Sequence, residues 1–150
     1  MKCEQLNLSA DNIKALAEAL QCYSDEFAEP LSERINFEEY SKKVLENGYA
    51  FIVKDFQDNI KGFVCGYAND LKTKVAFEST FVIDKELRGS GVAKALFEKQ
   101  LAFCKSKGMQ EIVFTTNRKN IGAVMFYQKM NVPIDEEHCT EKVLAYRKNL

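Results

Sequence analysis

The segment that most clearly suggests a ligand-binding function is ELRGSGVAKAL, at residues 86–96, which begins with a glycine-containing turn. Small residues after the turn begin a helical pattern, so several backbone N–H groups are left free at a helix N-terminus. Such groups, aided by the helix dipole, bind anions and above all phosphates. The segment lacks the lysine and Ser/Thr of a GxxxxGK(S/T) loop and the GxGxxG spacing of a dinucleotide fold, which argues against both of those nucleotide-binding classes. A plain surface turn before a helix is the alternative interpretation.

Two further segments place polar groups among apolar ones. In VAFESTFVI, residues 75–83, Glu78 is the only ionised side chain. Regular alternation along a strand places these residues on two faces. One face carries Ala76, Glu78, Thr80 and Val82. The other carries Val75, Phe77, Ser79, Phe81 and Ile83. In NIGAVMFYQKM, residues 120–130, Asn120 and Tyr127 share one broad helical face.

These motifs together resemble the GNAT superfamily of acetyl-coenzyme A (acetyl-CoA) dependent N-acetyltransferases. The family's turn between a strand and a helix, (Q/R)xxGx(G/A), is matched here by Arg88, Gly91 and Ala93. Its downstream helix, NxxAxxxY, is matched by Asn120, Ala123 and Tyr127. The resemblance follows the order of elements along the whole chain, but its specific motifs cover only residues 75–131.

The resemblance implies one α+β domain over residues 1–150, with a mixed, mostly antiparallel sheet, a parallel β-α-β crossover and about four flanking helices. It implies an enzyme that transfers the acetyl group of acetyl-CoA, by direct attack, to a primary amine of a small molecule or peptide. In the family, backbone groups at the strand end pair with the pantetheine arm, and the turn holds the pyrophosphate. The implied cofactor-binding residues are Phe81, Val82, Ile83, Arg88, Gly89, Ser90, Gly91, Val92, Ala93, Asn120 and Tyr127.

Three side chains are candidates for specific roles. Tyr127 occupies the position of a family tyrosine that protonates the leaving thiolate; a core tyrosine with its hydroxyl at the rim is the alternative. Glu78 is either a general base, because a primary amine with a pKa of about 10.4 is mostly protonated at neutral pH, or a solvent-facing strand residue. Asn120 either contacts the cofactor or caps its helix, and both roles can coexist. Two other function classes stay open: a coenzyme A binding or regulatory module without acetyl transfer, and an interaction domain in which both motifs are structural.

Hydrophobic periodicity places the motifs on a regular series of elements. Helical spacing predicts helices at residues 9–27, 37–47, 92–107 and 120–130. β-rich runs predict strands at residues 3–8, 49–56, 61–68, 74–83, 111–116 and 142–150. Residues 131–141 are predicted as a short strand or loop, and Asn131 stands where family members commonly have glycine. Because 19 residues follow Asn131, we expect a short or irregular closing hairpin.

Composition and charge exclude several function classes. The 21 Lys and Arg balance 22 Asp and Glu, and basic residues occur only in short pairs, so we expect neither nucleic acid nor an anionic membrane as a partner. The five cysteines form no CxxC pair, which indicates reduced thiols rather than disulfides or a zinc ribbon. The N-terminus lacks the apolar core of a signal peptide, and the run YAFIV is too short to span a bilayer. We therefore expect a cytoplasmic protein, and a homodimer is compatible with the sequence.

The single histidine, His138, lies beside Cys139 in DEEHC, so a nucleophile pair and a metal cluster are two interpretations to weigh. Adjacent residues diverge in a strand and no other ligand has metal-site spacing, so we expect a surface histidine and no metal. The acidic segments at residues 24–34 and 134–141 would suit a cationic acceptor, such as a polyamine, an aminoglycoside-like compound or a peptide N-terminus. The alternative is that both are solvated loops.

Overall fold

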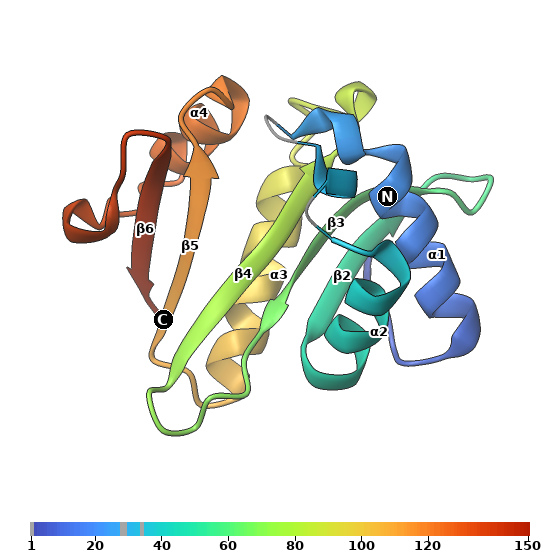
Figure 1. The fold of residues 1–150 in the computed structure, drawn as a ribbon, viewed down its shortest axis with the longest axis horizontal. Coiled ribbons are helices and arrows are strands. Elements are labelled where there is room, and N and C mark those ends of the chain that lie inside the picture. The colour runs from blue at the N-terminus through green and yellow to red at the C-terminus, as the bar shows by residue number, and fades with distance from the viewer. Residues whose placement is uncertain (1, 28–29, 34) are drawn as a thin grey trace.

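Six strands form one sheet in the order β1-β2-β3-β4-β5-β6 (Figure 1) in the computed structural model, which describes residues 2–27, 30–33 and 35–150. Neighbouring strands are antiparallel except β4 and β5, which run parallel with helix α3 between them in the chain. The strands are β1 (Cys3–Gln5), β2 (Tyr49–Lys54), β3 (Ile60–Tyr67), β4 (Val75–Ile83), β5 (Glu111–Asn117) and β6 (Val143–Asn149). The predicted mixed sheet with a β-α-β crossover is confirmed.

The α-helices of the described residues are α1 (Ala10–Cys22), α2 (Phe37–Asn47), α3 (Val92–Ser106) and α4 (Ile121–Lys129). Among them, α1, α2 and α4 begin at capping side chains, whereas α3 begins after Gly91 without one. The side chains of Ser9, Asn36 and Asn120 each accept a hydrogen bond from the backbone N–H three residues ahead, at 3.0, 3.0 and 3.1 Å. Among the described residues, no helix combines the length and the apolar character needed to cross a bilayer.

The segment after α1 turns back onto the sheet instead of extending the helix. α1 ends at Cys22, earlier than predicted, and a 3-10 helix η1 (Ser24–Glu26) follows. The Tyr23 hydroxyl donates to Asp84 Oδ2 over 2.7 Å, which ties this segment to the end of β4. A second 3-10 helix, η2 (Leu31–Glu33), lies before α2. Helical periodicity could not reveal this bend, because the contact joins residues 61 positions apart.

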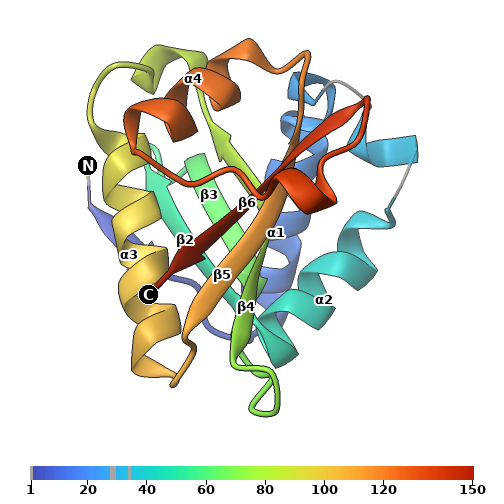
Figure 2. The same cartoon turned by 90° about the vertical axis from the view of Figure 1, so that its left-hand side faces the viewer.

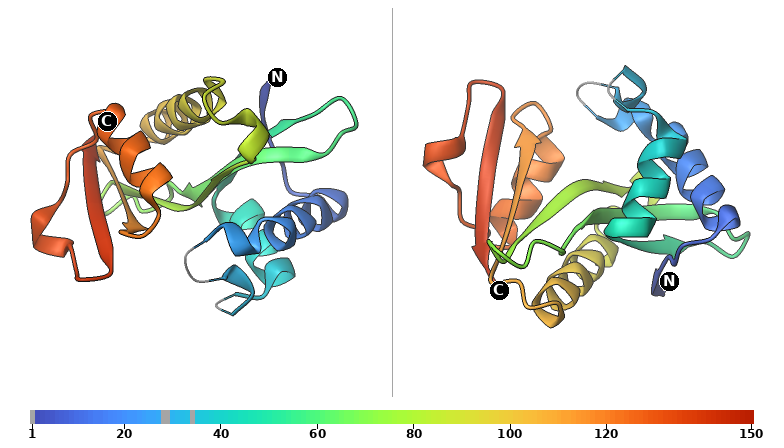
Figure 3. Two further views of the ribbon diagram at one scale, coloured as in Figure 1. Left: turned by 90° about the horizontal axis from the view of Figure 1, so that it is seen from above. Right: turned by 60° about the horizontal axis from the view of Figure 1, so that its bottom comes forward.

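The sheet separates two apolar cores. α1 and α2 cover one face, whereas α3 and α4 lie on the other (Figure 2, Figure 3). The core on the α1/α2 side includes Leu16, Leu20, Val44, Ile52 and Phe63. The core on the α3/α4 side includes Phe51, Leu96, Phe97, Phe114 and Tyr127. Because the central strands are covered on both faces, β2 and β3 are almost continuously buried.

β4 and β5 pair over a short stretch only. The parallel register joins Val75, Ala76 and Phe77 to residues 111–113, and beyond this point the two strands diverge (Figure 1). Within the described ranges, the C-terminal half of β4 therefore has β3 on one side and no strand on the other. The divergence creates an open strand edge inside the sheet.

An extra residue in β4 changes which side chains face α3. In the register with β3, the pairing passes from Thr80 directly to Glu78, so Ser79 forms a β-bulge. A bulge shifts the alternation of side chains by one position. Glu78 and Phe81 consequently both contact α3, whereas Ser79 and Thr80 both bond to Tyr40 of α2. The predicted alternation, with Glu78 and Phe81 on opposite faces, is wrong for this reason.

Residues 131–141 form a short closing hairpin, in line with the expectation for this segment. Asn131 has a φ of 56°, the left-handed conformation that glycine otherwise supplies after a helix. Ile134 makes one antiparallel bridge to Tyr146 of β6. A 3-10 helix η4 (Glu136–His138) then precedes β6.

Gly66 of β3 lies opposite the bulge, at a position where no larger residue fits. A Cβ added there would overlap the carbonyl oxygen of Phe77 and the hydroxyl of Tyr49, and it would lie 2.7 Å from Tyr49 Cζ. The missing side chain thus gives the Tyr49 ring the space to extend past β3.

We expect Gly66→Ala to lower the free energy of unfolding by about 2–3 kcal/mol, because the added methyl group meets a backbone carbonyl and a buried ring. Gly122→Ala is the matched control, since its nearest neighbour, Asn120 Oδ1, lies 3.9 Å from the added Cβ and alanine favours a helix. Urea unfolding of both variants tests the prediction. Equal midpoints for Gly66→Ala and wild type would contradict it.

Candidate functional site

A cavity of about 450 Å³ opens where β4 and β5 diverge. Its wall combines the end of β4, the turn before α3, the first turns of α4, and Glu26 and Phe27 from the segment after α1. Eight of the eleven predicted cofactor-binding residues line it: Phe81, Val82, Ile83, Arg88, Gly89, Ala93, Asn120 and Tyr127. The predicted residues that do not line it are Glu78, Ser90, Gly91 and Val92. The fold therefore brings the two sequence motifs to one place.

The open edge of β4 presents backbone groups that no strand uses. Asp84 N–H donates to the Lys61 carbonyl over 2.8 Å, which fixes the phase of the antiparallel ladder with β3. Because bonded residues alternate in such a ladder, Val82 bonds to β3, while Phe81 and Ile83 direct their N–H and C=O groups to the open edge. An extended chain can pair with this edge as an added strand. Val82 lines the cavity but offers no hydrogen bond on that edge.

The turn before α3 forms a cradle of N–H donors. Gly89 and Gly91 have φ angles of 79° and 88°, in the left-handed region that favours glycine, and a Cβ added at either would meet nothing within 4 Å. The first backbone bond of α3 runs from the Ala95 N–H to the Gly91 carbonyl. In the described part of the chain, no acceptor bonds to the backbone N–H groups of Gly89, Gly91, Ala93 and Lys94. Such a cradle fits a pyrophosphate.

Positive charge beside this turn is partly offset by one carboxylate. Glu26 Oε2 lies 3.2 Å from Arg88 Nη2, and its Oε1 lies 3.9 Å from Lys85 Nζ. The side chains of Arg88 and Lys85 are 59% and 73% exposed, so these ion pairs are weak and Arg88 can exchange its partner for another anion. Ser90 has a local role, because its hydroxyl donates to the Leu87 carbonyl and closes the turn.

The first turn of α4 forms the opposite wall. Asn120 Oδ1 accepts from the Ala123 N–H over 3.1 Å, which confirms its capping interpretation, and Asn120 also lines the cavity. Tyr127 lies two turns further along the same helix and is 4% exposed. α4 thus carries one polar group at the mouth of the cavity and one in its wall.

Tyr127 in this wall and Glu78 behind it belong to a buried series of hydrogen-bonded side chains. The Tyr127 hydroxyl donates to Glu78 Oε2 over 2.8 Å, and Gln100 Nε2 donates to Glu78 Oε1 over 2.7 Å. Gln100 Oε1 in turn accepts from the Tyr49 hydroxyl over 2.5 Å. All four side chains are at most 5% exposed. Glu78 is therefore not the solvent-facing residue that one interpretation of the sequence allowed.

Burial sets the protonation states of Glu78 and Tyr127. Loss of hydration raises the pKa of Glu78 to about 7, although the hydrogen bonds from Gln100 and Tyr127 lower it by favouring the carboxylate. Burial, together with the charge of Glu78, raises the pKa of Tyr127 well above its ordinary value. The site thus combines a hydroxyl that stays protonated at neutral pH with a carboxyl group that changes state there.

Gln100 and Tyr49 were not among the predicted site residues. Gln100 lies between Phe97 and Cys104 on the core-facing stripe of α3, where a polar residue departs from the apolar pattern and could have been noticed. Tyr49 carries no such signal, because tyrosine is common in strands. Its role depends on a contact with α3, 51 residues away.

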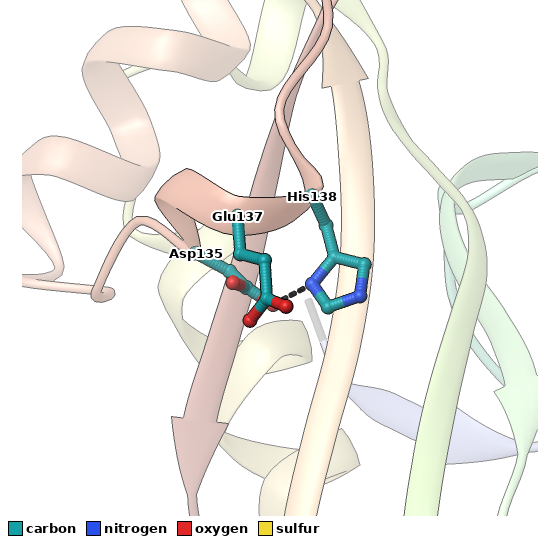
Figure 4. Close-up of side chains that lie close together, drawn as sticks. All are labelled: Asp135, Glu137 and His138. Carbon is teal, nitrogen blue, oxygen red and sulfur yellow. Dashed lines mark hydrogen bonds and ion pairs between the residues drawn. The ribbon is translucent and has the colours of Figure 1, made fainter.

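The acidic C-terminal loop is partly neutralised by its own neighbours. Asp135 Oδ2 lies 2.8 Å from His138 Nδ1 and 3.3 Å from Arg147 Nε. One ligand atom from each of Asp135, Glu137 and His138 lies within 4.8 Å of the others (Figure 4). The His138 side chain is 60% exposed, as expected for a surface histidine. Cys139 bonds through Sγ to the backbone of residues 135 and 145 rather than to the imidazole.

The other acidic segment, residues 24–34, contributes to the cavity at its start. Residues 28, 29 and 34 lie outside the described ranges. Ser24 is buried and its Oγ accepts from the Ser32 N–H over 3.0 Å. Glu26 and Phe27 line the cavity, so this segment supplies a carboxylate and an aromatic ring to the wall.

The sequence of this chain matches a family of acetyltransferases. Residues 13–131 match the family described as "Acetyltransferase (GNAT) family". N-acetyltransferase 8B of Homo sapiens is 30% identical over 101 residues, covering 65% of this chain and 44% of that protein. The chain therefore spans less than half the length of this curated relative.

Solved structures extend the likeness over the whole chain. An acetyltransferase of the GNAT family from Staphylococcus aureus Mu50 superposes with a TM-score of 0.78 at 18% identity, covering 99% of both chains. Arabidopsis thaliana NAA60, solved in complex with a bisubstrate analogue, superposes with a TM-score of 0.72 at 12% identity, covering 99% of this chain and 98% of that one. At these identities the likeness shows a shared fold.

The raised pKa of Glu78 predicts that stability depends on pH. Between about pH 4.5 and about pH 7 the folded protein keeps a proton that the unfolded chain releases. The free energy of unfolding therefore falls as pH rises through this window, by on the order of 3 kcal/mol. Glu78→Gln cannot ionise, so its stability relative to wild type should rise between about pH 5 and about pH 8, as measured by urea unfolding.

Glu98→Gln is the matched control, because Glu98 lies on the exposed face of α3 with its side chain 58% exposed. Its stability should follow that of wild type at both pH values. A Glu78→Gln profile parallel to that of wild type would show that Glu78 ionises normally.

Proposed function

The chain belongs to the GNAT acetyltransferase family, and on that premise we propose that it transfers the acetyl group of acetyl-CoA to a primary amine of a small molecule or peptide. One observation carries the proposal: an open strand edge, a cradle of N–H donors and a tyrosine backed by a carboxyl group meet around one cavity. Acyl transfer from a coenzyme A thioester needs a bound donor, a polarised carbonyl and a proton for the leaving thiolate. Each need has a counterpart here.

The donor would be held mainly by backbone groups. Acetyl-CoA supplies an acyl thioester that is activated for attack. The N–H groups of Gly89, Gly91 and Ala93 would hold its pyrophosphate, and Arg88 would add charge by exchanging Glu26 for a phosphate oxygen. The edge groups of Phe81 and Ile83 would pair with the pantetheine arm, and an N–H on this edge would polarise the thioester carbonyl.

Tyr127 would donate the proton that the thiolate needs. It lines the cavity, and burial keeps its phenol protonated at neutral pH. Glu78 does not line the cavity, and its Oε2 is bonded to the Tyr127 hydroxyl. We therefore propose that Glu78 acts on the reaction through Tyr127 and not as a base in direct contact with the acceptor.

The acceptor amine would meet the wall that Glu26 and Phe27 form. A carboxylate beside an aromatic ring suits a protonated amine with an apolar portion. This amine would release a proton to water in the cavity before it attacks the thioester as the neutral species. We further propose that the protein works in the cytoplasm. The five free cysteines, among them the buried Cys65 and Cys104, suit a reducing compartment.

Gly89→Ala should weaken the binding of acetyl-CoA by about tenfold, because a residue with a Cβ resists the left-handed φ and displaces the N–H donors. Gly108→Ala is the matched control: its φ of 86° is as strained and its added Cβ also meets nothing within 4 Å, but it lies at the other end of α3. Both variants should lose about 1 kcal/mol of stability. Calorimetric titration with acetyl-CoA should separate them, and equal affinities would remove the proposed cradle.

Tyr127→Phe should slow thiol release from acetyl-CoA by at least about 100-fold in the presence of a panel of primary amines, because it removes the proton donor. Its calorimetric Kd for acetyl-CoA should stay close to that of wild type. Tyr146→Phe is the control, since this buried ring lies 4.9 Å from the Tyr127 ring but makes no bond to Glu78. Turnover by Tyr127→Phe at the wild-type rate would end the assignment.

A further inference from the structure

We propose that Glu78 is an internal proton donor that recharges Tyr127, and that Gln100 and Tyr49 are positioning residues that orient Glu78 for this task. The proposal rests on the proposed function, acetyl transfer with Tyr127 as proton donor, and it names the source of the proton. Its basis is the buried chain of hydrogen bonds from Tyr49 through Gln100 and Glu78 to Tyr127.

Tyr127 separates Glu78 from the cavity. Tyr127 lines the cavity wall and Glu78 does not, while the Tyr127 hydroxyl oxygen and Glu78 Oε2 lie 2.8 Å apart. Each oxygen of the carboxyl group has one side-chain partner in the described residues: Oε2 faces Tyr127 and Oε1 faces Gln100. A proton that leaves Glu78 toward the cavity therefore passes through the Tyr127 hydroxyl.

The transfer of protons balances in two coupled moves. As the carbon–sulfur bond of the thioester breaks, its electron pair stays on sulfur, and Tyr127 gives its hydroxyl proton to that sulfur. Protonated Glu78 gives its own proton to the Tyr127 oxygen, so the phenol is neutral again and Glu78 becomes a carboxylate. The attacking nitrogen or water oxygen, which bonds to the acyl carbon as the carbon–sulfur bond breaks, releases its own proton to water in the cavity. After the products leave, that water returns a proton to Glu78 through Tyr127. Without this supply Tyr127 would remain a buried phenolate, which its surroundings oppose.

Gln100 decides which oxygen of Glu78 carries the proton. Its Oε1 accepts from the Tyr49 hydroxyl, so its Nε2 is the atom that faces Glu78. An amide nitrogen only donates, and Glu78 Oε1 must therefore accept. The proton of the neutral carboxyl group is thus placed on Oε2, and in that state the Tyr127 oxygen accepts this hydrogen bond while its own proton is free to turn away from Glu78. Tyr49 reaches Gln100 because Gly66 leaves room for its ring.

The groups around Glu78 allow it to exchange its proton near neutral pH. Tyr127 of α4, Tyr49 of β2 and Cys104 of α3 all have a pKa raised by burial and stay neutral there. Tyr146 of β6 lies beside Tyr127, and burial raises its pKa in the same way. No lysine, arginine or second carboxylate of the described chain bonds to Glu78, whose pKa is about 7.

The test uses the intact protein and acetyl-CoA alone, with water as acceptor, and compares wild type, Glu78→Gln, Tyr49→Phe and Tyr146→Phe. One measurement follows the chemical shift of the Glu78 carboxyl carbon by NMR across the pH range in ¹³C-labelled protein. A second follows thiol release against pH, and calorimetry gives the Kd for acetyl-CoA. We expect wild-type thiol release to decline as Glu78 ionises, with the same midpoint by both methods.

Glu78→Gln should release thiol at least about tenfold more slowly than wild type at low pH. Its rate of thiol release should no longer decline at the pH at which Glu78 ionises in wild type. Tyr49→Phe frees the Gln100 amide to turn, so both midpoints should rise by about half to one pH unit with an unchanged Kd. Tyr146→Phe should match wild type in all measurements. A wild-type pH profile in Glu78→Gln overturns the relay and leaves acetyl transfer standing. If wild type binds acetyl-CoA but releases no thiol with water or any amine, the proposed function fails and the relay fails with it.

Discussion

Parallel pairing between β4 and β5 stops at Phe77, and the position of every candidate functional group depends on that stop. Continued pairing would use the edge of β4 at Phe81 and Ile83 and would close the cavity. Because the strands diverge, α4 can enter from the β5 side and place Tyr127 against α3. The crossover helix α3 begins at the open end, so its free N–H groups lie beside the same edge.

Irregularities in the sheet then orient the polar groups. The bulge at Ser79 turns Glu78 toward α3, where Gln100 and Tyr127 can reach it. Gly66, across from the bulge, leaves the space in which Tyr49 reaches Gln100. In a regular strand Glu78 and Phe81 would face opposite sides of the sheet, and only one of them could contact α3. The buried chain of hydrogen bonds is therefore a product of one added residue and one absent side chain.

Features governed by local chemistry could be predicted from the sequence. Asn120 caps its helix, and residues 88–91 form a turn before a helix, because these outcomes depend on a few neighbouring residues. Features that depend on register or on distant contacts could not be predicted. The bulge at Ser79 is a property of the pairing with β3, and the early end of α1 depends on the bond between Tyr23 and Asp84.

The short seam between β4 and β5 also bears on how the molecule comes apart. β2, β3 and β4 are consecutive antiparallel strands, whereas β5 and β6 join them through three register pairs and the contacts of α3 and α4. Sub-global opening favours boundaries with few strand contacts, so we expect β5, α4 and β6 to separate from the meander as one unit. Such an opening carries Tyr127 away from Glu78. The proposed catalytic groups would thus be held together only while this seam is closed, and the lifetime of the closed seam would limit how long an assembled site persists.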